Sequence, residues 1–114
     1  MRKQTAYILK KVGVPPQKTG YDYIGDAVEM IHEDRRNLKG ITRKLYPAIA
    51  EKYGTTKTAV EAAIRHAIEA SMNNLGIREV EEIFGSTISY AKDKPTNACF
   101  LAVVAEMLED ENDG

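Results

Sequence analysis

Apolar residues recur at helical spacing along most of the chain. Their pattern predicts helices at about residues 3–12, 21–34, 41–53, 56–72, 78–84 and from 95 or 96 to 108. Glycine and proline separate these segments, most clearly at residues 13–16, 76 and 85. The sequence therefore predicts an all-α fold, a six-helix domain over residues 1–108, followed by a disordered acidic tail over residues 109–114.

The third and fourth predicted helices have the pattern of a helix-turn-helix. Ala50 places a small residue where the two helices cross, and Gly54, four residues later, tolerates the left-handed backbone of a short turn. We expect the turn at residues 53–55 and the recognition helix at residues 56–72. The inward face of that helix is one apolar stripe, formed by Val60, Ala63, Ile64, Ala67 and Ile68.

The starts of these two helices carry separate signals. Pro47 lacks a backbone donor, so the third helix either kinks there or begins afresh at Tyr46 and Pro47. Thr58 and Glu61 have the spacing of a capping box, in which each side chain accepts from a free amide of the first turn. We therefore expect the fourth helix to begin between Thr56 and Thr58.

Charge is distributed unevenly along the chain. The formal net charge is −1, which argues against nonspecific nucleic-acid binding. Residues 35–66, however, contain eight Lys or Arg residues and two Glu residues, a local charge of +6. The helix-turn-helix thus lies in the basic part of the chain. Acids crowd the second helix and should face solvent away from a nucleic acid: Asp22, Asp26, Glu29 and Glu33.

Several function classes lack support in the sequence. No segment approaches the roughly 20 apolar residues of a membrane span, and no apolar stretch follows the N-terminal lysines as in a signal peptide. Cys99 is the one cysteine and makes no internal disulfide, which favours a cytoplasmic setting. Two isolated histidines suggest no metal site, and no nucleophile pairs with a base. We expect no catalytic residue, no cofactor and no enzyme.

Several segments together resemble a known family. These are LYPAIA at residues 45–50, TT at 55–56 and AIRHAIE at 63–69, with further matches at 13–15, 18–23, 84–87 and 94–97. They resemble the C-terminal effector domain of the sporulation master response regulator, the stage zero sporulation protein A family. The resemblance implies a six-helix fold, sequence-specific DNA binding as tandem dimers and transcriptional activation or repression. That regulator's receiver domain is missing from these 114 residues, so we expect a fragment or a stand-alone relative.

The resemblance also bears on individual recognition-helix residues. It implies that Glu61, Arg65 and His66 match family positions, whereas arginines that contact bases in the family are replaced by Ala59 and Ala62. A bidentate Arg–guanine contact discriminates by about 1–3 kcal/mol, while alanine offers only a methyl contact to thymine. We therefore expect altered or weakened base readout.

The predicted DNA-binding surface combines the recognition helix with the starts of the third and sixth helices. Its members are Arg43, Lys44, Thr56, Lys57, Thr58, Glu61, Ala62, Arg65, His66, Lys92, Lys94, Thr96 and Asn97. Alternatives stay open for some of them. Arg65 and Glu61 could form an intrahelical ion pair, and Thr96 with Asn97 could cap the sixth helix.

The expected partners follow from this surface. We predict double-stranded DNA, bound as a homodimer, with RNA polymerase or a related regulator as further partners. The resemblance places dimer contacts at Val80, Ile83 and Phe84, although these could equally be core residues. The alternative function is a non-catalytic interaction module that keeps the fold, has lost specific DNA binding and contacts a related regulator.

Overall fold

The computed structural model describes residues 1–85 and 95–113, and that part of the chain contains helices and no strand. The elements are α1 (Lys3–Lys11), α2 (Thr19–Glu33), the 3₁₀ turn η1 (Arg35–Leu38), the π-helical turn η2 (Ile41–Leu45), α3 (Tyr46–Tyr53), α4 (Lys57–Asn74), α5 (Ile77–Phe84) and α6 (Asn97–Asp113). The predicted all-α, six-helix fold is confirmed.

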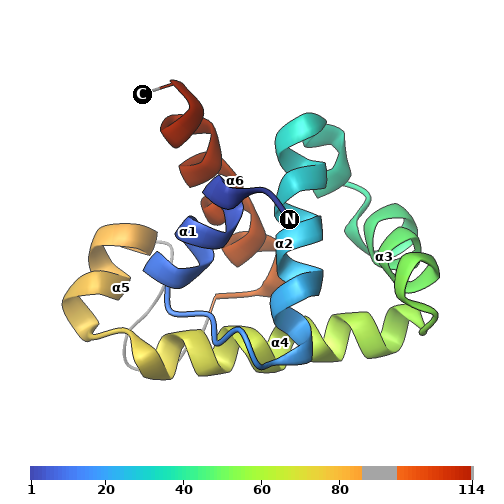
Figure 1. Cartoon of the computed structure of the whole chain (residues 1–114), viewed down its shortest axis with the longest axis horizontal. Coiled ribbons are helices and arrows are strands. Elements are labelled where there is room, and N and C mark those ends of the chain that lie inside the picture. Colours follow the sequence, from blue (N-terminus) through green and yellow to red (C-terminus); the bar gives the residue numbers. More distant parts are fainter. Residues whose placement is uncertain (86–94, 114) are drawn as a thin grey trace.

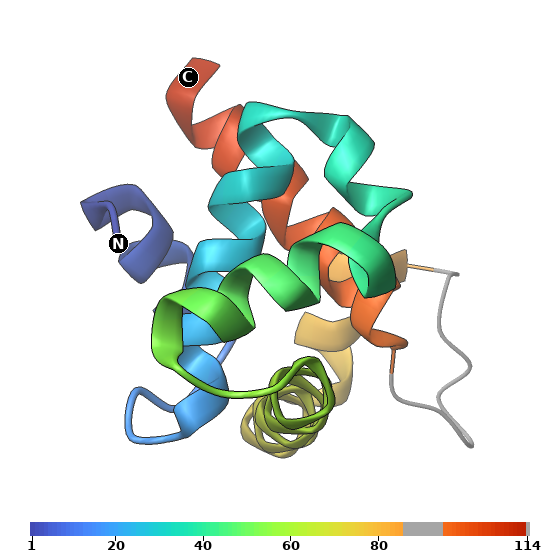
Figure 2. The same ribbon diagram turned by 90° about the vertical axis from the view of Figure 1, so that its right-hand side faces the viewer.

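The helices are arranged around α2. In Figure 1, α4 runs along the bottom of the molecule and α2 rises steeply from it, with α3 to the right and α5 to the left. Figure 2 looks almost along α4 and shows α2, α3 and α6 above it. Packing between α2, α4 and α6 forms the core, whose fully buried side chains include Ile24, Ile31, Ile64, Phe100 and Leu101.

Close contact between α2 and α4 depends on Gly20. A Cβ atom at this position would lie 2.2 Å from the backbone oxygen of Ala63 and 2.7 Å from Cβ of Ala67. Both distances are far shorter than van der Waals contact, so no larger residue fits without moving the helices apart. The small residues on α4 thus meet a residue of α2 that has no side chain.

Two hydrogen bonds join the end of α1 to the end of α4. The hydroxyl of Ser71 donates to the backbone oxygen of Val12 at 2.6 Å, and the Asn74 amide donates to the backbone oxygen of Gly13 at 2.8 Å. These bonds satisfy carbonyl groups that the end of α1 leaves without partners in its own helix. They hold the segment after α1 against α4.

The sequence left open whether the third helix kinks at Pro47 or begins afresh there, and the structure has two consecutive elements. The π-helical turn Ile41–Leu45 leads directly into α3, which begins at Tyr46 with Pro47 in its first turn. Proline is tolerated there because the amide it lacks would have no partner within the helix. A fresh start, rather than a kink, is the result.

A short turn at Gly54 joins α3 to α4. Gly54 has φ +65°, and the amide of Thr55 donates to the backbone oxygen of Ala50 at 2.9 Å. This pattern is a Schellman motif, which ends a helix through a left-handed residue. The turn predicted at residues 53–55 therefore lies where the backbone reverses.

The predicted capping box at Thr58 is wrong. Thr56 is the N-cap of α4: its backbone is extended, and its hydroxyl accepts a hydrogen bond from the Ala59 amide at 3.1 Å. Thr58 lies inside the first helical turn and is exposed. Thr56 and Thr58 both precede the apolar stripe, and Thr56, whose backbone is extended after the Gly54 turn, takes the cap.

Two further expectations need correction. The helix α6 continues through Asp113, past the end expected at Leu108, so the backbone of the acidic segment is helical there. On α2, Asp26 does not face solvent: its side chain is 12% exposed, and its carboxylate lies 3.0 Å from Nζ of Lys52 on α3. Glu29 likewise accepts hydrogen bonds from Arg2 and Thr5.

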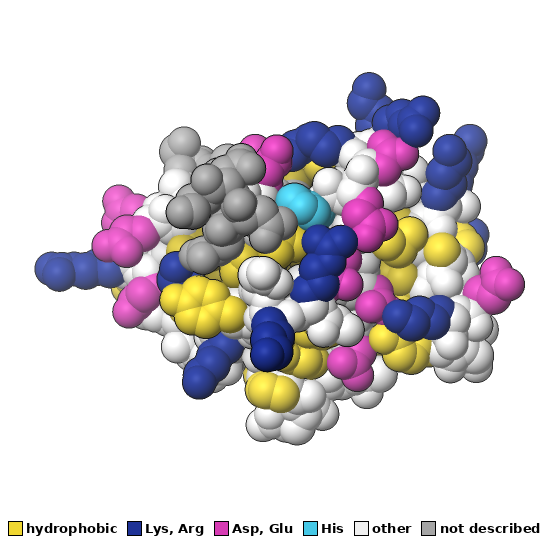
Figure 3. Space-filling model, turned by 45° about the horizontal axis from the view of Figure 1, so that its top comes forward, with side chains coloured by type: hydrophobic (Ala, Val, Ile, Leu, Met, Phe, Trp, Pro, Cys, Tyr) yellow, Lys and Arg dark blue, Asp and Glu magenta, His cyan; other side chains and the backbone are white. Residues whose placement is uncertain are grey.

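The surface mixes charges of both signs. Figure 3 shows Lys, Arg, Asp and Glu side chains interspersed with hydrophobic patches on one face. In the described part of the chain, no helix is both long enough and apolar enough to cross a membrane.

The helix contact at Gly20 yields a stability prediction. Replacing Gly20 with alanine should lower the free energy of unfolding by at least about 2 kcal/mol, because the added methyl group clashes with backbone rather than with a flexible side chain. Urea denaturation followed by circular dichroism measures the change. Gly40→Ala is the control, since its Cβ would meet the flexible Lys44 side chain at 3.2 Å. A Gly20→Ala protein as stable as the control would contradict the packing argument.

Candidate nucleic-acid interface

The helix α4 divides into a buried and an exposed face. Val60, Ile64, Ala67 and Ile68 are at most 1% exposed, which confirms most of the predicted inward stripe. Opposite to them lie exposed Thr58, Ala59, Arg65 and His66, and half-buried Ala62. We call these five residues the outward face of α4. Its short side chains, Thr58, Ala59 and Ala62, come first along the helix, and the longer Arg65 and His66 follow.

The start of α4 combines three features that suit an anion. Lys57 and Thr58 are exposed in the first turn, directly after the Thr56 cap. The first amides of a helix lack intrahelical partners, and they carry the positive end of the helix dipole. Thr56 satisfies the Ala59 amide, so the neighbouring amides and Lys57 stay available to a phosphate.

Arg65 is engaged within its own helix. Its guanidinium lies 2.5 Å from the carboxylate of Glu61, one turn earlier, with side-chain exposures of 48% and 40%. The hydrogen bond and charge of Glu61 raise the pKa of Arg65 above its ordinary value. The intrahelical pair that the sequence left as an alternative is thus present in the free protein. Exposed ion pairs of this kind contribute little stability, so another anion can replace the carboxylate.

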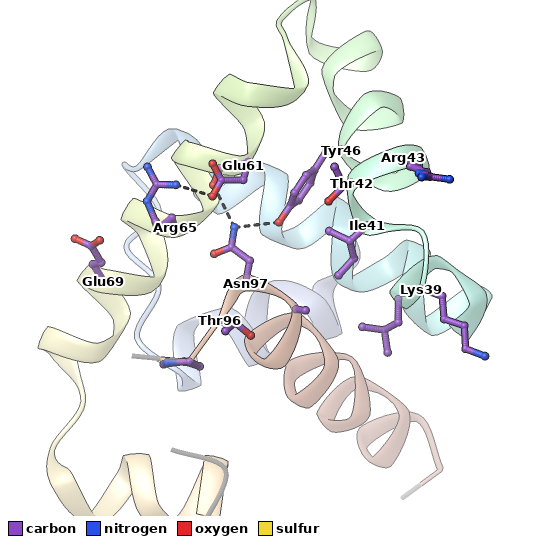
Figure 4. Close-up of a pocket in the computed structure, with 13 residues that line it drawn as sticks. Lys39, Ile41, Thr42, Arg43, Tyr46, Glu61, Arg65, Glu69, Thr96 and Asn97 are labelled. Carbon is purple, nitrogen blue, oxygen red and sulfur yellow. Dashed lines mark hydrogen bonds and ion pairs between the residues drawn. The ribbon is translucent and has the colours of Figure 1, made fainter. Parts of the chain in front are cut away.

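A groove of about 650 Å³ lies beside this pair (Figure 4). It runs between η2, the middle of α4 and the start of α6, and its cationic lining residues are Lys39, Arg43 and Arg65. The acids Glu61 and Glu69 line its α4 side. The predicted surface included Arg43 but missed Lys39, which lies between η1 and η2 and lines the groove. Lys44 is exposed on η2 as well.

Asn97 holds the groove together from the start of α6. Its side-chain amide donates to the hydroxyl of Tyr46 at 3.0 Å and to the backbone oxygen of Glu61 at 3.2 Å, as Figure 4 shows. Burial raises the pKa of Tyr46 above its ordinary value. The amide of Asn97 is therefore engaged within the protein, and its first role is to join α6 to α3 and α4.

The other predicted residues of this region differ in outcome. Thr96 is exposed, and its hydroxyl accepts from the Cys99 amide at 3.1 Å, so it caps α6 as the alternative proposed. Lys92 and Lys94 lie outside the described residues.

The predicted dimer contacts on α5 are only partly accessible. Phe84 is 3% exposed and stacks on Phe100 with ring centres 5.6 Å apart. Phe84 thus packs in the core, which is the alternative that the sequence left open for this residue. Val80 and Ile83 are half-buried against the core, while Ile77, which the sequence reasoning missed, is 73% exposed. Dimerisation through α5 stays a prediction.

The arrangement of α3, α4 and the groove is typical of helical DNA-binding domains. A short turn joins two helices, and the second helix presents a solvent-facing side with basic residues beside a partly cationic groove, as in helical DNA-binding domains. Among the described residues, no group of His, Cys, Asp and Glu could hold a metal ion.

The family model described as "Sporulation initiation factor Spo0A C terminal" matches residues 5–108 of the 114-residue chain. The chain belongs to this family of DNA-binding sporulation regulator domains.

The bridging role of Asn97 can be tested by substitution. Asn97→Ala should lower the free energy of unfolding by about 1–2 kcal/mol, because two hydrogen bonds are lost and the hydroxyl of the buried Tyr46 loses its Asn97 partner. Thermal and urea denaturation provide the measurement. Asn73→Ala, at an exposed position of α4, is the matched control and should change stability by less than about 0.5 kcal/mol. Equal effects of the two substitutions would argue against a bridging role.

Proposed function

We propose that the outward face of α4 enters the major groove of duplex DNA. With alanine at positions 59 and 62, this face reads a different DNA sequence from the one that arginines at these positions would read. The observation that carries this proposal is the exposed side of α4, which begins at a capped, cationic helix start. A helix in the major groove uses residues near its N-terminus for base edges. Thr58, Ala59 and Ala62 occupy those positions.

Phosphate contacts position the domain on the duplex. Lys57 and the first amides of α4 contact one backbone strand, while Arg43, Lys44 and Lys39 on the η1–η2 segment contact the backbone beside the groove. Such contacts supply affinity without reading sequence. Their exposure and their position around α4 support this role.

Base readout on this face depends on methyl groups and one guanidinium. Ala59 is exposed and Ala62 lies at the centre of the outward face, so their methyl groups can contact the 5-methyl group of thymine. Arg65 reaches a base or phosphate by exchanging the Glu61 carboxylate for DNA. Glu61 itself then becomes free to accept from cytosine.

Selection from a random duplex pool tests the proposal as a whole. The full chain should enrich one family of sequences, and binding should weaken steeply with added salt because neutralised phosphates release counterions. Failure to enrich any sequence, together with no duplex binding at low salt, would contradict it. That outcome would favour the interaction-module alternative.

Lys57 provides a quantitative test of backbone contact. Lys57→Ala should weaken binding to all duplexes alike and reduce the slope of log K against log salt by about 0.9, the value for one phosphate contact. Fluorescence anisotropy at four salt concentrations measures this slope. Lys10→Ala, which removes an equivalent exposed charge on α1, should leave it unchanged. An unchanged slope for Lys57→Ala would place the DNA elsewhere.

The methyl contact of Ala62 can be isolated on the selected duplex. Replacing each thymine in turn with deoxyuridine removes only a methyl group, and at the position facing Ala62 affinity should fall about fourfold, or about 0.8 kcal/mol. For the Ala62→Gly protein, the ratio of its affinity for the thymine duplex to its affinity for the deoxyuridine duplex should approach one at that position. If no thymine shows such a loss, the readout assigned to Ala62 is incorrect.

A further inference from the structure

The helix α1 presents a basic and aromatic face to solvent. Four exposed residues lie on this face at helical spacing: Lys3, Tyr7, Lys10 and Lys11. The opposite side of the helix, including Ile8 and Leu9, is buried. Tyr7 is 54% exposed, and Nζ of Lys11 lies 5.4 Å from the centre of its ring. An exposed tyrosine among lysines has no role in the core.

A groove of about 660 Å³ borders this face of α1. Its lining includes Tyr7, Lys10, Pro15, Pro16 and Tyr21. Proline and tyrosine rings give flat, rigid surfaces of the kind that bind extended peptides. The hydrogen bonds from Ser71 and Asn74 to the end of α1 hold one wall of the groove in place.

The charge around this groove is positive. Lys10 is the one charged residue that lines it among the described residues, with Lys3 and Lys11 on the same helix face and Lys18 at the start of α2. Asp22, next to Tyr21, is exposed at the start of α2.

We propose that this groove, lined by Tyr7, Lys10, Pro15, Pro16 and Tyr21, binds an extended acidic peptide segment of a partner protein. A proline or other apolar side chain of the segment packs against the tyrosine and proline rings, while its carboxylates pair with Lys10 and Lys3. The combination of cations with an apolar lining favours this ligand over a purely apolar or basic segment.

The groove is separate from the outward face of α4. It reaches α4 at Asn74, the last residue of that helix, about 25 Å along the axis from Lys57 at 1.5 Å per residue. A partner bound there leaves the start of α4 accessible to DNA. The proposal therefore stands independently of the function proposed for α4.

Selection of peptides from a random displayed library on the immobilised full chain tests this inference. Enriched peptides should be acidic and contain proline or another apolar residue, and their affinity should fall as salt increases. No enrichment, or enrichment of neutral or basic peptides, would overturn the proposal.

Matched variants locate the binding surface. Lys10→Glu and Tyr7→Ala should each weaken the selected peptide at least tenfold in fluorescence anisotropy. Both residues are exposed, and circular dichroism melts verify that the variants fold. Lys57→Glu, a charge reversal at the start of α4, should leave peptide affinity unchanged. Peptides that bind Lys10→Glu as tightly as wild type would refute the assignment.

Duplex DNA provides the opposite control. Lys10→Glu should bind the selected duplex as wild type does, whereas Lys57→Glu should bind it more weakly. If Lys10→Glu and Lys57→Glu weaken DNA binding equally, the α1 groove is part of the nucleic-acid surface and the peptide proposal is overturned. Intact peptide binding without any DNA binding would refute the function proposed for α4 alone.

Discussion

The close approach of α2 to α4 at Gly20 is the constraint on which the rest of the structure depends. With no side chain at this position, α2 can lie against Ala63 and Ala67, and the buried stripe of α4 faces the core. A helix whose one side is held this closely must present its opposite side to solvent. The outward face of α4 is therefore a consequence of packing on its inward face, and the same packing leaves α6 free to cover the other side of α2.

Polar contacts then set the surroundings of that outward face. Asn97 joins the start of α6 to Tyr46 and to the backbone at Glu61, so three elements border one groove. Within it, the Glu61–Arg65 pair neutralises the central cation of α4 until another anion competes for it. In the function that we propose, the short side chains at positions 59 and 62 leave room for close approach of DNA and limit direct base readout. That proposal assigns affinity to phosphate contacts and discrimination to few base contacts.

The two proposed surfaces share one scaffold but differ in chemistry. The start of α4 offers helix amides and cations, which suit phosphate, while the groove beside α1 offers aromatic and proline rings with lysines, which suit an acidic peptide. Ser71 and Asn74 connect the two regions through α4, because they bind the end of α1. A regulator domain with this layout can contact DNA and a protein from different sides.

The sequence by itself determined the helices, the inward stripe of α4 and the turn at Gly54, because helical periodicity and a left-handed residue are local properties. Sequence reasoning placed the capping box at Thr58 rather than Thr56, since both threonines precede the same stripe. Tertiary structure alone decided that Asn97 binds residues 36 and 51 positions away, that Asp26 pairs with Lys52 and that Phe84 stacks on Phe100. Periodicity shows which side of a helix is buried, but the partner on that side depends on how distant segments pack.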